Sequence, residues 1–466
     1  MFVHPEGFLE PTDAGAWRAH GLLARARHGQ YHSDVPEPPL RAHAGSPYAS
    51  LRIPDFRRFV FGLFAFTMAI QIQGTVVGWQ IYELTHDKLA LGLIGLAEAL
   101  PFIGAALYAG HLADRHDRRR IAVAALTLLV ACAVALLVLP IVLPATLLLP
   151  WIYGTIVVSG LGRSFLLPAR QALGAELVPR HLYGNAITWR SGAWQLAAVL
   201  GPAVGGLLYA AGGPTLTYAA DAVLMAVGLV SIAGLRHRSP IHHANTEAVL
   251  QSLATGIRFV WGDQVILGAL SLDLFSVLFG GATALLPVFA EDILRVGPEG
   301  LGLLRAAPAI GAVATSVCLA YARPFSRTGV VLLRSVGAFG VCMIVFGLST
   351  SFPLSVVALT LSGASDMVSV FIRSTLIQTL TPAHMLGRVS AVNAIFVGSS
   401  NEIGAFESGV TAKVFGTIPS VVVGGIATLT VVGAAAVRLP ALRQLGRIDL
   451  QARVTTTEPG SDASER

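Results

Sequence analysis

Long apolar stretches follow one another along most of the chain and are separated by short polar segments. A helix that crosses the hydrocarbon core of a bilayer needs about 20 mostly apolar residues. Twelve stretches reach that length, near 57–83, 89–113, 121–143, 148–169, 186–211, 214–235, 264–289, 300–322, 329–349, 353–377, 389–412 and 417–438. Glycine and proline inside the stretches fit close packing of membrane helices. The pattern predicts an all-α integral membrane protein with twelve transmembrane helices.

Composition supports a membrane protein and excludes several other classes. Of the 466 residues, 54% are hydrophobic and 12% are charged, and the mean hydropathy is +0.68. A soluble domain carries about 25% charged residues. The chain therefore has too few charges for an ordinary soluble enzyme, a nucleic-acid-binding protein or a disordered scaffold. The three cysteines lie in apolar stretches and offer no disulfide framework or metal cluster.

The basic residues between the stretches predict the orientation in the membrane. Cytoplasmic loops are enriched in arginine and lysine. If the N-terminus is cytoplasmic, twenty-two arginines fall in the inward segments, against Lys88, Arg295 and Lys413 in the outward loops. Both termini are therefore expected in the cytoplasm, and the net charge of +6 reflects topology rather than ligand binding.

Polar segments divide the chain into five expected parts. The first fifty residues lack an apolar core, and a polar segment separates six stretches from six. The parts are a disordered cytoplasmic tail (1–50), a first six-helix bundle (51–235), a cytoplasmic linker (236–258), a second six-helix bundle (259–440) and a cytoplasmic C-terminal tail (441–466).

The two halves repeat each other when the chain is shifted by 203 residues. The coinciding pairs are Arg170 with Arg373, Pro179 with Pro382, His181 with His384, Gly184 with Gly387, Gly201 with Gly404 and Gly206 with Gly409. Repeated halves with a substrate site at their interface, near the bilayer midplane, are typical of secondary transporters. We therefore expect a carrier that works by alternating access.

The segment between the second and third stretches, Gly110-His111-Leu112-Ala113-Asp114-Arg115-His116-Asp117-Arg118-Arg119-Arg120, carries the most specific signal. Gly110 permits two helices to approach closely. A carboxylate at Asp114 can interact with the positive N-terminus of a neighbouring helix. A plain positive-inside loop would explain the arginines, but not Gly110 together with Asp114.

This segment resembles the loop G-x-L-A-D-R-x-G-R-[RK] of the major facilitator superfamily, with Asp117 where many members have glycine. The resemblance implies the major facilitator fold, in which two pseudo-symmetric six-helix bundles face each other. It also implies a conformational gate, in which contact with the start of the eleventh span steadies the outward-open state. The implied gate residues in this loop are Gly110, Asp114, Arg115, Arg118 and Arg119.

A second pattern, Ala197-x-x-x-Gly201-Pro202-x-x-Gly205-Gly206, lies in the fifth stretch. It resembles G-x-x-x-G-P-x-x-G-G of exporters and antiporters in the same superfamily, with alanine in place of the first glycine. The proline frees a backbone carbonyl, and the glycines permit bending and tight helix contacts. The resemblance implies export and adds Gly201, Pro202 and Gly205 to the gate. Ordinary helix packing is the alternative interpretation of these residues.

From about residue 50 to 445 the chain is similar to this superfamily, and within it to the bacterial group that includes the enterobactin exporter and related secretion permeases. The similarity is carried by Pro168-Ala169-Arg170-Gln171-Ala172-Leu173, Leu285-Leu286-Pro287-Val288-Phe289-Ala290 and Leu386-Gly387-Arg388-Val389. It implies a multi-pass protein of the bacterial cytoplasmic (inner) membrane, a small-molecule substrate and a monomer.

Ionisable residues inside the stretches are candidates for ion coupling, because each costs about 2.5–3.5 kcal/mol on insertion scales. A proton-coupled carrier needs a carboxylate that binds a proton and that water reaches from either side in turn. The candidates are Asp273, Asp366 and Glu402, together with Arg373, which shares one helix face with Asp366. Each acid has a structural ion pair as its alternative role. Glu98 and Asp221 are weaker coupling candidates. Arg163 and Arg305 are available as basic partners.

Amides and aromatic rings in the first and fifth stretches predict a substrate cavity. The candidates are Gln71, Gln73, Trp194 and Gln195. A mostly apolar cavity with a few amides and aromatic rings accepts amphipathic organic molecules.

The sequence contains no phosphate-binding glycine loop with a lysine and no dinucleotide or metal-binding pattern. We therefore expect neither an enzyme nor a cofactor or metal. The sequence predicts a secondary active transporter that exports a siderophore, drug or lipophilic metabolite in exchange for protons. Two alternatives stay open. One is an uptake carrier or uniporter of the same fold, and the other is a transport-inactive membrane receptor or assembly protein.

Overall fold

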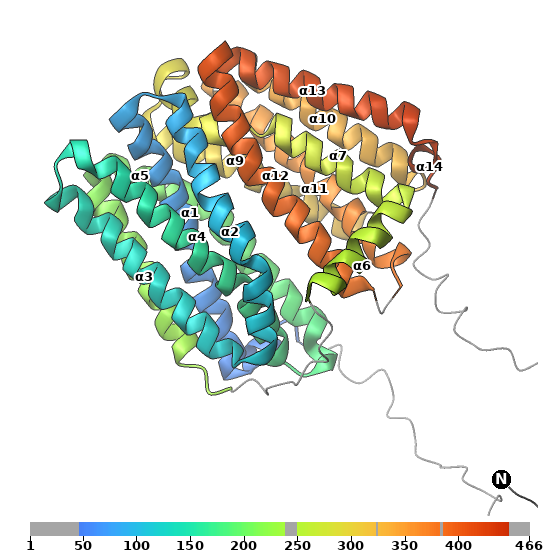
Figure 1. Ribbon diagram of the computed structural model, residues 1–466, viewed down its shortest axis with the longest axis horizontal. Coiled ribbons are helices and arrows are strands. Elements are labelled where there is room, and N and C mark those ends of the chain that lie inside the picture. Colours follow the sequence, from blue (N-terminus) through green and yellow to red (C-terminus); the bar gives the residue numbers. More distant parts are fainter. Residues whose placement is uncertain (1–45, 238–248, 323–324, 383–384, 447–466) are drawn as a thin grey trace, which may run out of the picture. The chain divides into compact units, whose positions relative to one another are not determined.

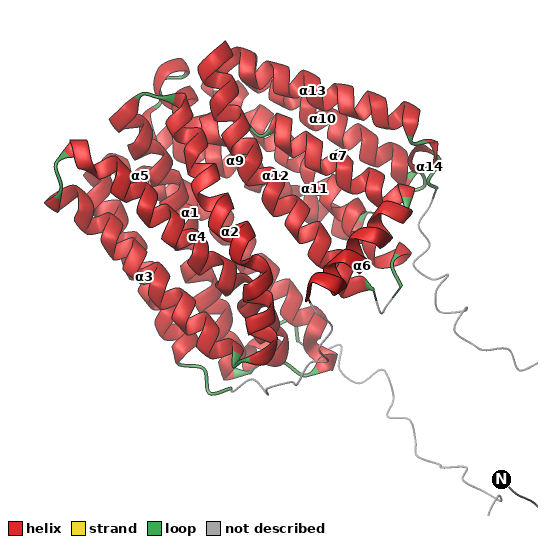
Figure 2. Cartoon of the chain, viewed as in Figure 1, coloured by secondary structure: helices red, strands yellow, loops and turns green. Residues whose placement is uncertain are grey.

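The computed structural model describes residues 46–237, 249–322, 325–382 and 385–446, without the side chains of 106, 107, 111, 114 and 249–253. The compact unit that holds the helices begins at Tyr48. Throughout these described ranges the regular structure is helical, and no strand is present (Figure 2). The predicted all-α membrane fold is confirmed.

The first half of the chain forms one group of long helices, coloured blue to green in Figure 1. They are α1 (Pro54–Thr85), α2 (Lys88–Arg115), α3 (Arg118–Val142), α4 (Ala145–Glu176) and α5 (Tyr183–Ala233), with short 3-10 turns at Ser50–Arg52 and Arg180–Leu182. Helix α1 packs along α5, and α3 packs against α4 and α5. The first group therefore has its core around α1 and α5.

Helix α5 contains two crossings, because its chain reverses at Gly213. This residue has φ of +64°, which glycine adopts without steric cost. Before the reversal, the Tyr209 hydroxyl donates a hydrogen bond to Glu83 at 2.5 Å. After it, the Tyr218 hydroxyl donates to the Gln80 side-chain oxygen at 2.6 Å. Both arms of α5 therefore pack against the same end of α1.

The second half forms the other group, coloured yellow to red in Figure 1. Its helices are α6 (Val249–Gly262), α7 (Gln264–Gly280), α8 (Leu286–Val288), α9 (Gly297–Tyr321), α10 (Thr328–Leu348), α11 (Phe352–Leu380), α12 (Leu386–Phe415), α13 (Thr417–Arg438) and α14 (Pro440–Arg443). Helix α6 begins inside the segment expected to be a linker and packs against α12. The later part of that segment therefore belongs to the second helix group.

The crossing expected at 264–289 is interrupted. Helix α7 ends at Gly280, a 3-10 turn covers Ala282–Leu285, and a π turn at Phe289–Ile293 follows α8. Pro287 lies in the middle of this region and has no backbone N–H to continue a regular helix. A hydrophobic run alone does not reveal such a break.

Ten helical segments of the described residues are long and apolar enough to cross a membrane. This count takes α5 as one crossing and omits α12, which carries charged residues such as Glu402, Glu407 and Lys413. With the second arm of α5 and with α12, the structure is consistent with the twelve predicted crossings.

Glycines allow the closest helix contacts. Gly206 of α5 meets the backbone of α9 at Pro298 and Gly302, and Gly92 of α2 meets Gly409 of α12. Both contacts join the two halves of the chain. In the absence of a strong hydrophobic drive between helices in lipid, this close approach supplies much of the attraction.

The contact between α9 and α11 predicts a large effect of one substitution. A Cβ atom at Gly311 would lie 1.8 Å from the carbonyl oxygen of Thr360, whereas one at Gly104 would meet no atom within 4 Å. We expect Gly311→Val to cost about 1–3 kcal/mol through overpacking and to lower the thermal unfolding midpoint of the detergent-solubilised protein. Gly104→Val is the control. Equal midpoints for the two variants would contradict this packing.

Candidate functional site

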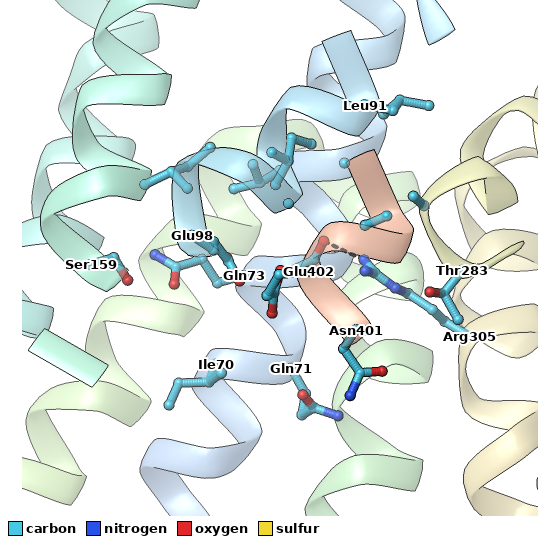
Figure 3. Close-up of a pocket in the computed structure, with 18 of the residues that line it drawn as sticks. Ile70, Gln71, Gln73, Leu91, Glu98, Ser159, Thr283, Arg305, Asn401 and Glu402 are labelled. Carbon is cyan, nitrogen blue, oxygen red and sulfur yellow. Dashed lines mark hydrogen bonds between the residues drawn. The ribbon is translucent and has the colours of Figure 1, made fainter. Parts of the chain in front are cut away.

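A cavity of about 290 Å³ lies between the two halves of the chain (Figure 3). Its walls come from α1, α2, α4 and one residue of α3 in the first half, and from α9, α12 and the interrupted region after α7 in the second. The polar lining residues are Gln71, Gln73, Glu98, Thr155, Ser159, Arg163, Thr283, Arg305, Asn401 and Glu402. Two predicted cavity residues, Gln71 and Gln73, are therefore in place.

Three helices of the first half are joined at the cavity by Arg163 of α4. One guanidinium nitrogen lies 3.1 Å from both carboxylate oxygens of Glu98 on α2. The other terminal nitrogen donates a hydrogen bond to the side-chain oxygen of Gln73 on α1, also at 3.1 Å. Hydrogen bonds from a charged guanidinium to a carboxylate are stronger than those between neutral groups, so this contact orients Arg163 between the two helices.

The second half contributes Arg305 of α9 and Glu402 of α12, which Figure 3 shows on opposite sides of Asn401. Arg305 donates a hydrogen bond to the backbone carbonyl oxygen of Gly74 on α1. A Cβ atom at Gly74 would lie 4.0 Å from the guanidinium, and one at Gly78 would lie 3.8 Å from it. Because neither glycine has a side chain, the Arg305 guanidinium can approach the backbone of α1.

The cavity lining thus holds two carboxylates and two guanidinium groups, whose formal charges cancel. Of the predicted proton-coupling residues, Glu402 lies here. Glu98, Arg163 and Arg305 had a lesser role in the sequence interpretation, because their positions in apolar stretches do not tell which helix faces point at each other.

The other predicted coupling residues lie within the second half. Arg373 of α11 forms an ion pair with Asp273 of α7, and each side chain is 6% exposed. Asp366 lies within electrostatic range of both. None of the three belongs to the cavity lining.

Two predicted cavity residues of α5 lie elsewhere. Trp194 is 48% exposed and lines a separate pocket beside α1 and α4. The Gln195 amide donates a hydrogen bond to the Ser191 hydroxyl at 3.3 Å. Neither belongs to the lining of the central cavity. No residue of α5 belongs to that lining, and the sequence pattern did not reveal that this helix stands back from the cavity.

The segment joining α2 and α3 is held to the first half. Arg118 pairs with Glu176 at the end of α4, and Arg119 donates a hydrogen bond to the backbone of Ala233. Asp117 caps α3 by accepting from the Arg119 N–H at 3.0 Å, which gives this departure from the family pattern a structural role. Arg115 ends α2 and is exposed.

Gly110 and Asp114 are the two other predicted gate residues of that loop. A Cβ atom at Gly110 would meet nothing within 4 Å, so the close helix contact expected at Gly110 is not formed in this conformation. The side chain of Asp114 lies outside the described part of the chain.

The second gate pattern lies at tight helix contacts. A Cβ atom at Gly201 would lie 2.5 Å from the Cβ of Gln71 on α1, and one at Gly205 would lie 3.3 Å from the Cα of Ile72. Pro202 is buried in the same part of α5. These residues pack α5 against α1, and Gly206 beside them touches α9.

Polar contacts close the two halves together at one end of the cavity. The Tyr82 hydroxyl donates to Asp292 at 2.5 Å. The other two contacts are His86 with Glu291 at 3.7 Å and Lys413 with Asp87 at 2.7 Å. We call these three pairs the latch. The hydrogen bond from the Lys413 ammonium lowers the pKa of Asp87 from its usual range.

Known proteins resemble this chain in sequence and in fold. The model of a family described as transmembrane secretion effector matches residues 45–464. The enterobactin exporter EntS of Escherichia coli O1:K1 (APEC) is 30% identical over 347 residues, which covers 73% of this chain and 80% of EntS. A mutant of the peptide transporter POT is similar in structure, with a TM-score of 0.68, 14% identity, and coverage of 84% of this chain and 95% of the other. A mutant of the nucleoside transporter NupG is also similar in structure, with a TM-score of 0.67 and 11% identity. The match covers 83% of this chain and 100% of the other.

With the repeated helix groups and the shared cavity, these matches define a transporter of the major facilitator fold, a multi-pass membrane protein. The family resemblance seen in the sequence is thereby confirmed. More narrowly, the chain belongs to the transmembrane secretion effector family. The proteins that it matches are transporters rather than enzymes.

The buried pair in the second half predicts a stability effect. Asp273→Asn leaves the Arg373 guanidinium buried without its partner, and breaking such a pair costs about 3–5 kcal/mol. We expect a lower thermal unfolding midpoint in detergent, with recovery when Arg373→Met is added. Asp366→Asn is the control because it leaves the pair intact. An Asp273→Asn protein as stable as the original would contradict a structural role for the pair.

Proposed function

We propose that this protein exports a small organic molecule across a bacterial cytoplasmic membrane by alternating access, in exchange for protons. The observation that carries the proposal is the charge-balanced cavity between two repeated halves that a latch holds together at one end. The relative EntS is an exporter by name, and the pattern around Pro202 supports the same direction.

The orientation follows from the loops. The latch residues Asp87 and Lys413 border the loops that carry few basic residues, and the arginine-rich segments lie at the other end of the helices. By the positive-inside rule the latch faces outward and both termini lie in the cytoplasm. The conformation described here is then closed to the outside, and cargo enters the cavity from the cytoplasm.

We assign the proton-carrying role to Glu402. It is the predicted coupling acid that shares the cavity with the cargo, so cargo and proton can compete for one site. Arg305 and Arg163 lie within electrostatic range of this carboxylate, as does Glu98. Loss of the negative charge on protonation would change the balance among these four groups, and it would weaken the hold of Glu402 on the arginines. Asp273, paired with Arg373, is better suited to holding α7 against α11.

The test is proton flux in inside-out vesicles that carry an imposed pH gradient, with siderophores and cationic or neutral drugs added one at a time. We expect one class of compound to dissipate the gradient, and Glu402→Gln to reduce this flux at least tenfold. Glu407 lies on the same helix but outside the cavity lining. The control variant Glu407→Gln is therefore expected to retain the proton flux.

The alternatives give other results in the same vesicles. A uniporter would move labelled compound without protons, and an uptake carrier would show net transport in the opposite direction. A receptor would show neither flux. Full proton coupling in Glu402→Gln would refute the assignment of this residue.

The latch predicts a pH dependence of closure. Because Lys413 lowers the pKa of Asp87 in the closed protein, the Asp87–Lys413 pair of the latch is fully formed above the ordinary aspartate pKa, about 3.9. Its contribution is lost as the outside pH falls through the lowered value. At neutral pH, Asp87→Asn should mimic the acid state and raise the rate at which an impermeant thiol reagent added outside labels Gln71→Cys in a cysteine-free background.

Exposed ion pairs contribute about 0.2–1 kcal/mol, so we expect an increase of up to about fivefold. Lys88→Gln, at the neighbouring position and without a contact in the latch, is the control and should label at the original rate. Slower labelling in Asp87→Asn would contradict the latch.

A further inference from the structure

A second pocket, of about 350 Å³, lies between α1, α4 and α5. Its lining includes Arg170 and Gln171 of α4, and Arg190, Ser191 and Trp194 of α5. Arg170 follows Arg163 by seven residues, so it lies on the same face of α4 about 10 Å farther along the axis. Arg170 therefore lies farther from the latch than Arg163 does.

The two arginines have no acidic partner within the described residues. No carboxylate belongs to the pocket lining, and the charge that acts on Arg170 is that of Arg190. The Nε atom of Arg190 is buried without a hydrogen-bond acceptor. Two like charges thus share one pocket, and the part of the chain that the structure describes adds no carboxylate to its lining.

The surroundings of Arg190 hold its guanidinium in place. Its carbon lies 5.9 Å from the centre of the Phe59 ring, within the range of a cation–π contact. A Cβ atom at Gly174 would lie 2.9 Å from the same guanidinium carbon. The guanidinium therefore lies between the Phe59 ring and Gly174, in a space that the side chain of a larger residue at 174 would occupy.

In the second half of the chain, the arginine that matches Arg170 has an acidic partner. Arg170 coincides with Arg373 in the repeat, and there α7 supplies Asp273 as a partner. In the first half the corresponding helix, α1, supplies Phe59 and Leu63 to the pocket instead. Burying an arginine without a partner is costly, and an anion bound in the pocket would remove that cost.

We propose that Arg170 and Arg190 bind the acidic group of an organic anion on its way from the cytoplasm to the central cavity. Gln171 and Ser191 offer further hydrogen-bond donors, and the exposed ring of Trp194 offers an apolar surface for the body of the molecule. The site thereby narrows the cargo to amphipathic compounds that carry a carboxylate or a similar oxyanion. This inference rests on the proposed export function.

The experiment is equilibrium dialysis of the full chain in phosphatidylcholine nanodiscs against 1-naphthoate and its neutral counterpart 1-naphthamide. We expect naphthoate to bind at least tenfold more tightly than naphthamide. The combined variant Arg170→Gln/Arg190→Gln should abolish this preference and leave naphthamide binding unchanged. Arg180→Gln, an exposed arginine outside the pocket, is the control. Unchanged naphthamide binding also shows that the double variant is folded.

Three results would overturn the proposal. One is equal binding of both compounds to the original protein, and another is a preference that survives in the double variant, which would place the anion elsewhere. The third is loss of naphthoate binding when phosphatidylglycerol is added to the nanodiscs, which would make a lipid headgroup the occupant. Dialysis requires no transport. Binding through these arginines without proton flux for any compound would therefore contradict the proposed export and leave the anion site standing.

Discussion

A charged side chain inside a membrane protein is costly unless an opposite charge or a dipole meets it, and this constraint explains the surroundings of Arg163 and Arg373. Arg163 satisfies it by bonding Glu98 and Gln73 at once, so that one side chain of α4 fixes its position relative to α2 and α1. In the second half, Arg373 and Asp273 connect α11 to α7 in the same way. The first-half side of the cavity is therefore bordered by helices that their own polar side chains connect.

The two halves are joined by contacts of two physical kinds. Glycine crossings, such as Gly206 against Gly302, are steric and depend on backbone surfaces that fit closely. The latch consists of polar side chains near the helix ends, where water competes for the exposed pair Lys413–Asp87, whereas Tyr82 is buried. Gly92 and Gly409 lie about one helical turn from Asp87 and Lys413, so opening this end of the cavity has to part both kinds of contact.

Much of the fold could be predicted because apolar length and loop charge report directly on the bilayer. The reversal at Gly213 and the break before Pro287 depend on local backbone geometry, and the second was not anticipated. The site was harder to predict. Gln73 was expected in the cavity and Glu402 was expected to couple protons; both line the cavity, whereas Trp194, also expected there, lines another pocket. Helix faces in a membrane protein carry little amphipathic contrast, since lipid and core are both apolar, so the sequence does not tell which side of a helix faces the cavity.

The hydrogen bond from Arg305 to Gly74 joins the halves through a backbone carbonyl rather than a side chain. Every residue type, proline included, has a backbone carbonyl, so mutation of Gly74 cannot delete this acceptor; it can only block access to it by adding bulk at Gly74 or Gly78. The other polar side chains around the cavity are free of that restriction, whereas Arg305 supplies the donor of this bond. Over evolutionary time the rest of the lining can therefore diverge while Arg305 keeps the connection between the halves.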